Sequence, residues 1–155
     1  IIFGTGFKVA DGLATMNVTG RDGGKLADAW AEGPEALLGT TVAGFPNLFT
    51  IVGPNTGLGH SSMVLMIESQ LSYVLDAMGT VDRHRAVAID TRPESQAEFN
   101  VELQERLAKT VWATGGCVSW YLDERGRNRT LWPASTFAFR RRTRRIDPAA
   151  HELVA

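Results

Sequence analysis

The segment from Gly53 to Ser62 combines residue types that can bind an anionic or electron-rich group. It contains three glycines, and glycine lets a ligand approach the backbone closely. Residues 48–53 are apolar and an apolar helical pattern follows the segment, so free amides at the helix start would point into the turn. An ordinary strand-to-helix loop, with His60 and the two serines as caps, has the same pattern. Neither a Gly-Lys-Ser/Thr nor a G-x-G-x-x-G spacing marks it as a phosphate-binding loop.

Histidine and cysteine, which often carry acid-base, nucleophilic and metal chemistry, give no catalytic site here. Nothing near His60 supplies a partner carboxylate, which favours a capping role over catalysis. Cys117 has no visible histidine partner, which favours an inert thiol over a nucleophile. The histidines at positions 60, 84 and 151 are too scattered for a set of metal ligands. We therefore predict no catalytic residue and no metal site in this chain.

Apolar and β-branched runs predict the strands of a mixed α/β fold that must position this turn. Residues 1–4 have the form of the end of a buried strand, and residues 48–53 form another. Residues 85–90 alternate enough to be a short third strand. Since a buried strand rarely starts a natural protein, we expect further sequence before Ile1.

A helix is predicted directly after the turn, beginning at Ser61 and ending near Gly79. Its first turn is apolar on every side, which predicts that this end of the helix is enclosed. Its apolar face is expected to consist of Met63, Ile67, Leu71, Val74 and Met78.

A second long helix is predicted from Pro93 to Gly115, because proline is tolerated in a first turn and glycine ends helices. A short helix is predicted at residues 26–30. The buried stripe of the second long helix is expected to consist of Phe99, Leu103, Leu107 and Val111.

The composition is that of one globular domain: 155 residues, of which 44% are hydrophobic and 21% charged. A formal net charge of -1 argues against nucleic acid or an acidic membrane surface as an obligatory partner. No apolar run approaches the roughly 20 residues that a membrane span needs. A single cysteine excludes an internal disulfide and favours the cytoplasm. The basic run Arg140–Arg145 could bind a phosphate, but such runs are more often solvated faces or docking edges.

Three segments together resemble one protein family. Ile2-Phe3-Gly4-Thr5-Gly6-Phe7 is similar to the Ala-Thr-Gly-aromatic segment of flavoprotein monooxygenases, although Gly4 replaces the usual alanine. The segment from Gly53 to Glu68 resembles the Gly-Pro to Ile-Glu segment of Baeyer-Villiger enzymes. Gly116-Cys117-Val118-Ser119-Trp120-Tyr121, followed by Gly126-Arg127-Asn128, resembles their Ser-Trp-Tyr segment. The order and spacing indicate the C-terminal portion of a Baeyer-Villiger-type flavoprotein monooxygenase that uses FAD and NADPH.

The resemblance implies a role for particular residues. Helix-start amides beside the flavin would stabilise negative charge on its reduced form. The indole N–H of Trp120 would hydrogen-bond NADP. The implied cofactor-binding residues are Thr5, Gly6, Gly53, Asn55, Ser62, Met63 and Trp120. The implied substrate-binding residues are Leu58, Gly59 and His60.

The resemblance also implies a division of the chain. Residues 1–80 would be the end of the linker and the C-terminal part of an FAD-binding domain. Residues 81–155 would be a C-terminal extension packing on the FAD and NADP domains. The family's G-x-G-x-x-G turns belong upstream of residue 1, and none is present. We therefore expect a fragment that is inactive alone and needs a missing N-terminal portion or a partner chain.

The implied reaction of the intact enzyme is oxygen insertion next to a ketone carbonyl to give an ester, with NADPH and O2. A related monooxygenase that oxidises nitrogen or sulfur is one alternative, although the Ser-Trp-Tyr setting of Trp120 favours the ketone. A non-catalytic interaction domain that binds through Arg140–Arg145 is another.

Overall fold

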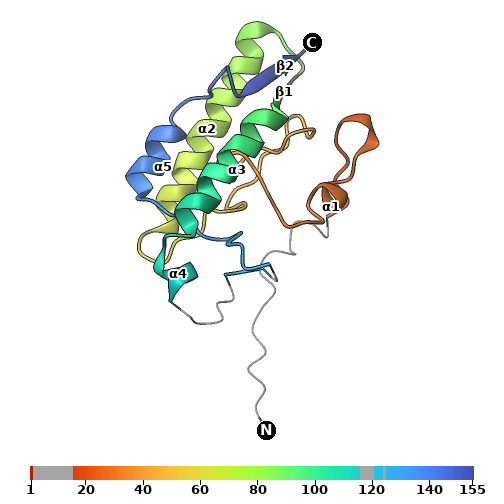
Figure 1. The fold of residues 1–155 in the computed structure, drawn as a ribbon. Coiled ribbons are helices and arrows are strands. Elements are labelled where there is room, and N and C mark those ends of the chain that lie inside the picture. Colours follow the sequence, from red (N-terminus) through yellow and green to blue (C-terminus); the bar gives the residue numbers. More distant parts are fainter. Residues whose placement is uncertain (2–15, 116–120, 124) are drawn as a thin grey trace.

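The computed structural model describes residues 1, 16–115, 121–123 and 125–155 of the chain. Two long helices account for most of its regular structure (Figure 1). In chain order the elements are the 3-10 helix η1 (Arg21–Gly23), α1 (Leu26–Ala29), α2 (Met63–His84), β1 (Ala88–Thr91), α3 (Pro93–Leu107), α4 (Val111–Thr114), α5 (Thr136–Arg142) and β2 (His151–Val154).

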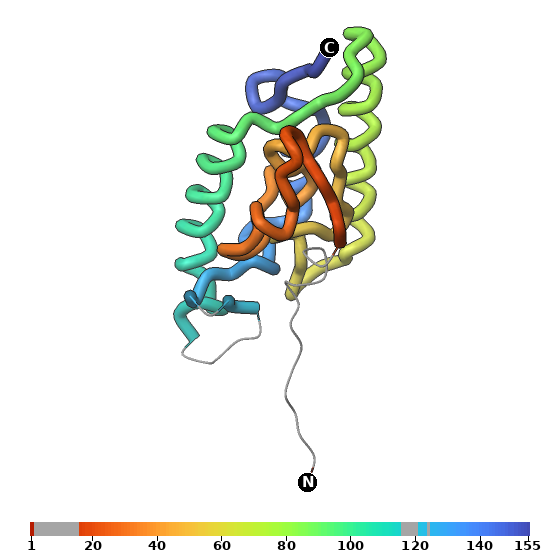
Figure 2. Tube along the Cα trace, turned by 90° about the vertical axis from the view of Figure 1, so that its right-hand side faces the viewer, coloured from red at the N-terminus to blue at the C-terminus, as the bar shows by residue number. Residues whose placement is uncertain are grey.

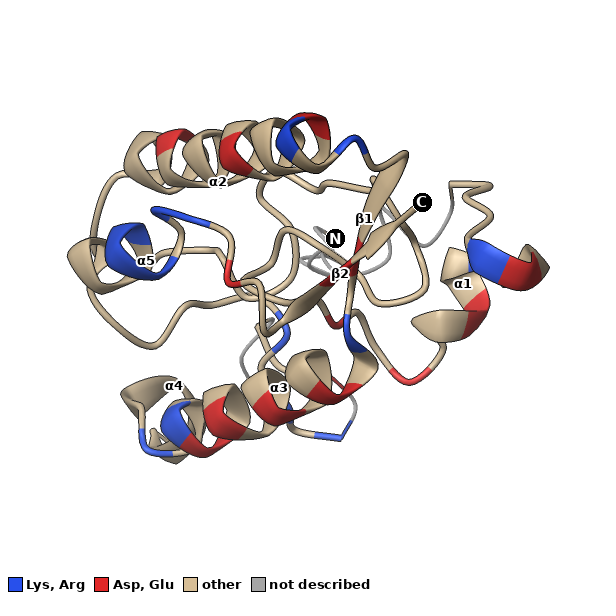
Figure 3. Ribbon diagram, turned by 90° about the horizontal axis from the view of Figure 1, so that it is seen from above, with Lys and Arg blue, Asp and Glu red and all other residues tan. Residues whose placement is uncertain are grey.

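The long helices α2 and α3 lie on opposite sides of a layer of mostly irregular chain (Figures 2 and 3). α5 lies beside α2. The main core joins these parts, since Leu38 of the irregular layer is buried in one cluster with Met66 of α2 and Leu103 of α3. A smaller cluster around Leu26 and Trp30 packs α1 against residues 36–45.

The two strands form an antiparallel pair at one end of this layer. Ala88 pairs with Val154 and Thr91 with His151, so the last residues of the chain are fixed beside the start of α3. The α/β fold class is confirmed. The sheet is nevertheless smaller than the sequence suggested, and the irregular layer takes its place in the core.

The strand predicted at residues 48–53 is wrong, since the chain makes only a single bridge there, between Thr41 and Phe49. Asn47 and Val52 have φ angles of 59° and 57°, which an extended strand does not contain. The Val52 amide donates to the side chain of Gln70 instead of to a neighbouring strand. The strand predicted at residues 85–90 is present, displaced to 88–91, whereas the one predicted at residues 1–4 lies outside the described residues except for Ile1.

The helix after the turn forms, but it passes through Gly79 and ends at His84. A glycine inside a helix costs only about 1 kcal/mol relative to alanine, so it does not have to end one. The left-handed conformation of Arg85 ends α2, and the Arg85 amide donates to the Asp82 carbonyl. Within the described residues the first turn of α2 is not enclosed, since Val64 is 60% exposed.

The buried face of α2 is not the predicted one. Leu71 and Met78, expected to be buried, are exposed. Both sides of α2 carry apolar residues, and internal hydrogen bonds allow two polar residues to be buried on the inner side. The buried residues of α2 are Met66, Ser69, Gln70, Tyr73 and Ala77.

The predictions for the second long helix hold for its first four turns. Phe99, Leu103 and Leu107 are buried as predicted. α3 ends at Leu107, where the Thr110 hydroxyl donates to the Leu107 carbonyl and so satisfies a terminal acceptor. Val111 begins the separate helix α4 and is exposed, against the prediction. The short helix at residues 26–29 is confirmed.

Truncation of the α3 core contact should be costly. Leu103→Ala is expected to lower the free energy of unfolding by about 2–5 kcal/mol, because it opens a cavity between the two long helices. Val101→Ala, at a residue of the same helix that is 61% exposed, should change it by less than about 0.5 kcal/mol. Urea unfolding measures both values, and equal effects would contradict the assignment of the buried face.

His151 should make stability depend on pH. Burial lowers the pKa of His151, and the hydrogen bond from its Nδ1 to the Asp147 carbonyl offsets this only in part. Nε2 therefore accepts from the Tyr73 hydroxyl, 3.2 Å away, in a neutral ring. As the pH falls, the histidine of the unfolded chain binds a proton at a higher pH than the folded one does. The contribution of neutral His151 to the free energy of unfolding is therefore fully present above the ordinary pKa of about 6.5 and is lost as the pH falls below it.

The measurement is urea unfolding of the wild type and His151→Gln at pH 7.5 and pH 5.5. The wild type should lose more stability between the two values than the variant. Burial raises the pKa of Asp90, whose contribution has the opposite sign, and the comparison of the two proteins cancels it. Equal losses in both proteins would show that His151 is not the group responsible.

Candidate cofactor site at the start of α2

The turn from Gly53 to Ser62 has a buried half and an exposed half. Residues 53–56 are buried, residues 57 and 58 are half-buried, and residues 59–62 are exposed. The exposed half leads directly into the first turn of α2 at Met63. The turn therefore has a base fixed inside the protein and a tip open at the end of a 22-residue helix.

Asn55 fixes the base from within. Its side-chain amide donates to the carbonyls of Asn128, at 2.7 Å, and Leu131, at 3.2 Å. Its backbone amide donates to the Arg129 carbonyl, and its φ of 59° turns the chain sharply. Asn55 is only 2% exposed, and its Oδ1 has no hydrogen-bond partner among the described residues.

Gly57 continues the same connection. Its amide donates to the Thr130 carbonyl, and its carbonyl accepts from the Trp132 amide, each at 2.8 Å. A Cβ at position 57 would lie 2.8 Å from the Thr130 carbonyl oxygen, so the two segments approach as closely as glycine allows. The turn and residues 128–132 thus form one unit.

Gln70 of α2 fixes the chain just before the turn. Its Nε2 donates to the carbonyls of Gly39 and Thr50, at 2.9 and 3.2 Å, and to the Thr40 hydroxyl. Its Oε1 accepts from the Val52 amide at 2.9 Å. Gln70 is fully buried, so one side-chain amide satisfies backbone groups from two loops that have no strand partner.

The exposed tip leaves the start of α2 uncapped. Ser62 is the N-cap residue, but its side chain makes no capping hydrogen bond. Ser62 thus leaves the first amides of α2 without its cap, and within the described residues the positive end of the helix dipole is open. Trp112 of α4 closes one side of the tip, since a Cβ at Gly59 would lie 2.8 Å from its ring. Tyr121 packs edge-on against Trp112, with ring centroids 5.2 Å apart.

The structure brings together most of the residues that the sequence singled out. Gly53 and Asn55 lie in the buried base, and Leu58 and Met63 are half-buried against the core. The exposed tip contains Gly59, His60 and Ser62. Thr5, Gly6 and Trp120 lie outside the described residues, as does Cys117.

Sequence reasoning missed the residues that support the turn. Gln70 is a polar residue in a mostly apolar helix pattern, and Trp112 belongs to none of the three segments that resemble the family. Asn128 stood in the segment that resembles the family, without a role. The contact between Asn55 and Asn128 spans 73 positions of the chain, and no local periodicity reports such a contact.

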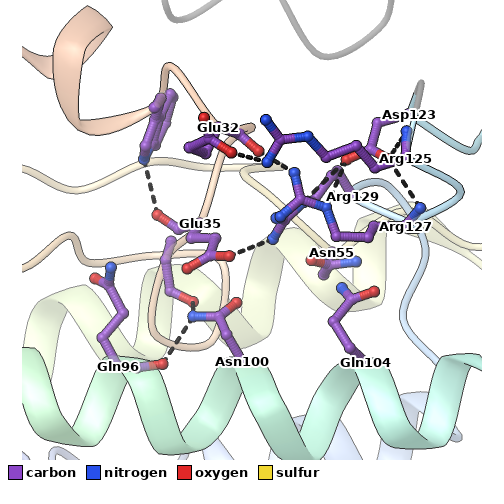
Figure 4. Close-up of polar contacts among 12 residues, drawn as sticks. Glu32, Glu35, Asn55, Gln96, Asn100, Gln104, Asp123, Arg125, Arg127 and Arg129 are labelled. Carbon is purple, nitrogen blue, oxygen red and sulfur yellow. Dashed lines mark hydrogen bonds and ion pairs between the residues drawn. The ribbon is translucent and has the colours of Figure 1, made fainter.

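An ionic cluster fixes Asp123 and residues 125–129 against the chain around Glu35 (Figure 4). Arg129, whose side chain is only 2% exposed, bonds to Glu35 at 2.5 Å and lies 3.6 Å from Asp123. Arg127 donates to Asp123 at 3.0 Å and to the Glu32 carbonyl. Burial raises the pKa of Asp123, but hydrogen bonds from Arg127 and Arg125 outweigh it and hold the pKa below its usual value. The segment that carries Asn128 is therefore fixed from both sides.

Other classes of site have less support. Among the described residues, no cluster of histidine, cysteine and carboxylate side chains could hold a metal ion. The helices of the described part of the chain are each too short or too polar to cross a lipid bilayer. Within the arginine run, Arg142 is used internally: it lies 3.6 Å from Glu102 and over the Phe99 ring. Figure 3 shows the rest of the run at the end of α5.

Removal of the Gln70 amide should destabilise the whole protein. Gln70→Met keeps the volume but leaves the buried Thr50 carbonyl without this partner and removes hydrogen bonds to Gly39 and Val52, which should cost about 1–3 kcal/mol. Ser72→Ala, at an exposed position of the same helix, should cost less than about 0.5 kcal/mol. Thermal unfolding compares them, and a neutral Gln70→Met would contradict the supporting role.

The chain is similar to a group of known proteins. It matches no protein-family model. It is 52% identical, over 155 residues, to a Baeyer-Villiger monooxygenase of Streptomyces coelicolor, a match that covers 99% of this chain and 30% of that protein. The chain thus spans about 30% of the length of this relative.

Solved structures agree with this match. A closed crystal structure of cyclohexanone monooxygenase superposes with a TM-score of 0.79 and 26% identity, covering 99% of this chain and 30% of the other. OTEMO in complex with FAD and NADP gives a TM-score of 0.81 and 25% identity, covering 97% and 28%. These matches and the identity to the Streptomyces relative show that the chain corresponds to a segment, about 30% in length, of a Baeyer-Villiger-type flavoprotein monooxygenase, which agrees with the C-terminal portion predicted from the sequence.

Proposed function

We propose that the chain supplies part of the active site of a flavin-dependent monooxygenase. The intact enzyme would use NADPH and O2 to insert an oxygen atom next to a ketone carbonyl and release an ester. The observation that carries the proposal is the open, uncapped start of α2, which follows the glycine-rich turn resembling the family's Gly-Pro to Ile-Glu segment. A ketone as the substrate is supported by two similar proteins, which are a Baeyer-Villiger monooxygenase and a cyclohexanone monooxygenase.

The residues at this end of α2 fit a flavin. The uncapped amides that follow Ser62, beginning at Met63, would hold an electron-rich edge of the ring, and the helix dipole would favour negative charge there. Bound FAD would supply the transfer of electrons between NADPH and O2. Because Gly53 and Asn55 are buried beneath the tip, they would serve the flavin through the shape and backbone of the turn.

The remaining site residues have separate proposed roles. Leu58, Gly59 and His60 would form one wall of the ketone pocket, and the packing of Trp112 on Gly59 would keep that wall in place. Thr5, Gly6 and Trp120 would contact the cofactors, with Trp120 binding NADP through its indole N–H. The roles of Thr5, Gly6 and Trp120 follow from the family resemblance.

The division of the chain also stays a proposal. Residues 1–80 would close the FAD-binding domain, and residues 81–155 would form the extension that packs on it. The hydrogen bonds from Asn55 and Gly57 to residues 128–131 cross this boundary, which supports an extension that positions the flavin turn. The nucleotide-binding portion or a partner chain would complete a cytoplasmic enzyme with no nucleic-acid partner.

A chimeric protein tests the function. We define it as the Streptomyces coelicolor relative in which this chain replaces the segment that it matches. With FAD, NADPH and cyclohexanone, the chimeric protein should consume NADPH and form the ester, whereas the 155-residue chain alone should do neither. Turnover by the chain alone would contradict the proposal, as would oxidation of amines or sulfides by the chimeric protein without ester formation.

One substitution tests the helix-start amides. Val64→Pro removes one amide donor in the first turn of α2, where the amides have no intrahelical partner to lose, and Val64→Ala is the matched control for the lost side chain. In the chimeric protein, Val64→Pro should bind FAD about three- to tenfold more weakly than Val64→Ala, as expected for one lost hydrogen bond. If flavin fluorescence gives equal FAD affinities for the two variants, the Val64 amide does not bind the flavin.

A further inference from the structure

The outer side of α2 carries a row of apolar residues that the described part of the chain leaves exposed. Val64, Leu71, Leu75 and Met78 have relative exposures of 60%, 47%, 67% and 54%. Their spacing places them on one side of the helix, opposite the buried side that contains Met66, Tyr73 and Ala77. We call these four residues the outer stripe.

The outer stripe is longer than ordinary surface exposure explains. Single exposed apolar side chains are common on soluble proteins, whereas contiguous apolar patches mark interaction surfaces. The distance from Val64 to Met78 along the helix is about 21 Å, at about 1.5 Å per residue. A helix that is apolar on two opposite sides is typical of one packed between two bodies. Among the described residues, only the inner side of α2 is packed against other parts of the chain.

We propose that the remaining, nucleotide-binding part of the flavoprotein packs on the outer stripe. This inference rests on the proposed function. The matched segment is about 30% of the relative, so the relative contains more than twice the length of this chain outside that segment. The stripe begins at Val64, one residue into α2 and next to the proposed flavin turn. A protein domain that covers the flavin turn would therefore also contact the start of the outer stripe.

The charges beside the stripe disfavour a second copy of this chain as the occupant. Glu68 and Asp82 are exposed on the same side of α2, with Glu68 between Val64 and Leu71 and Asp82 one turn after Met78. In a parallel pair of α2 helices, each carboxylate would face its own copy. In an antiparallel pair centred on Leu75, Glu68 would face Asp82. Both arrangements place like charges together, so an apolar surface flanked by basic side chains fits the stripe better.

Cysteine labelling tests the proposal. Leu75→Cys is introduced into a Cys117→Ser background, in the chain alone and in the chimeric protein. Maleimide labelling is followed at the level of single peptides, and Val101→Cys on α3 is the matched exposed control. Labelling at position 75 should be at least about tenfold slower in the chimeric protein, because the centre of an interface is desolvated. Labelling at position 101 should proceed at the same rate in both proteins.

Two outcomes would overturn the proposal. The first is equal labelling rates at position 75 in the two proteins, or protection at position 101 that is as strong as at position 75. The second is a chain that sediments alone as a dimer and loses that dimer on Leu75→Asp, which would assign the stripe to a second copy. Ester formation is measured separately, so an inactive chimeric protein with a protected stripe would contradict the proposed function and leave the docking surface intact.

Discussion

The buried amide of Gln70 is the interaction on which the rest of the structure depends. The core between α2 and α3 is filled mostly by irregular chain, whose backbone groups cannot pair along a ladder as strands do. An unpaired buried amide or carbonyl costs about 1–3 kcal/mol, so such a layer is stable only where side chains supply the missing partners. One glutamine supplies them to two loops at once, which explains why a polar side chain occupies the most buried side of α2.

The same principle fixes the candidate cofactor site. Asn55 and Gly57 attach the base of the turn to residues 128–131, and the ionic cluster around Arg129 fixes those residues in turn. The result is a rigid base beneath an exposed tip and an uncapped helix start. Preorganised donors of this kind are what a site that stabilises developing negative charge requires, because they need not reorganise when the charge appears. The irregular layer is thus the support of the site rather than a defect in the fold.

Sequence reasoning recovered the features that local spacing reports. The helices around Met66 and Phe99 follow from the three- and four-residue recurrence of apolar residues, and the turn at Gly53 follows from its glycines. The buried face of α2 could not be recovered, because both faces are apolar and Gln70 looks like a surface residue until its partners are known. The support of Asn55 by Asn128 was equally invisible, since it joins distant segments. The roles of Thr5, Gly6 and Trp120 stay predictions.

Amide hydrogen exchange in the chimeric protein tests most directly whether the open start of α2 binds the flavin. Uncapped first-turn amides exchange quickly when nothing covers them. Exchange at residues 63–65 should slow when FAD is added, while exchange at the C-terminal end of α2, residues 82–84, should not change. Unchanged exchange at residues 63–65 with FAD fully bound would contradict the account and place the flavin elsewhere.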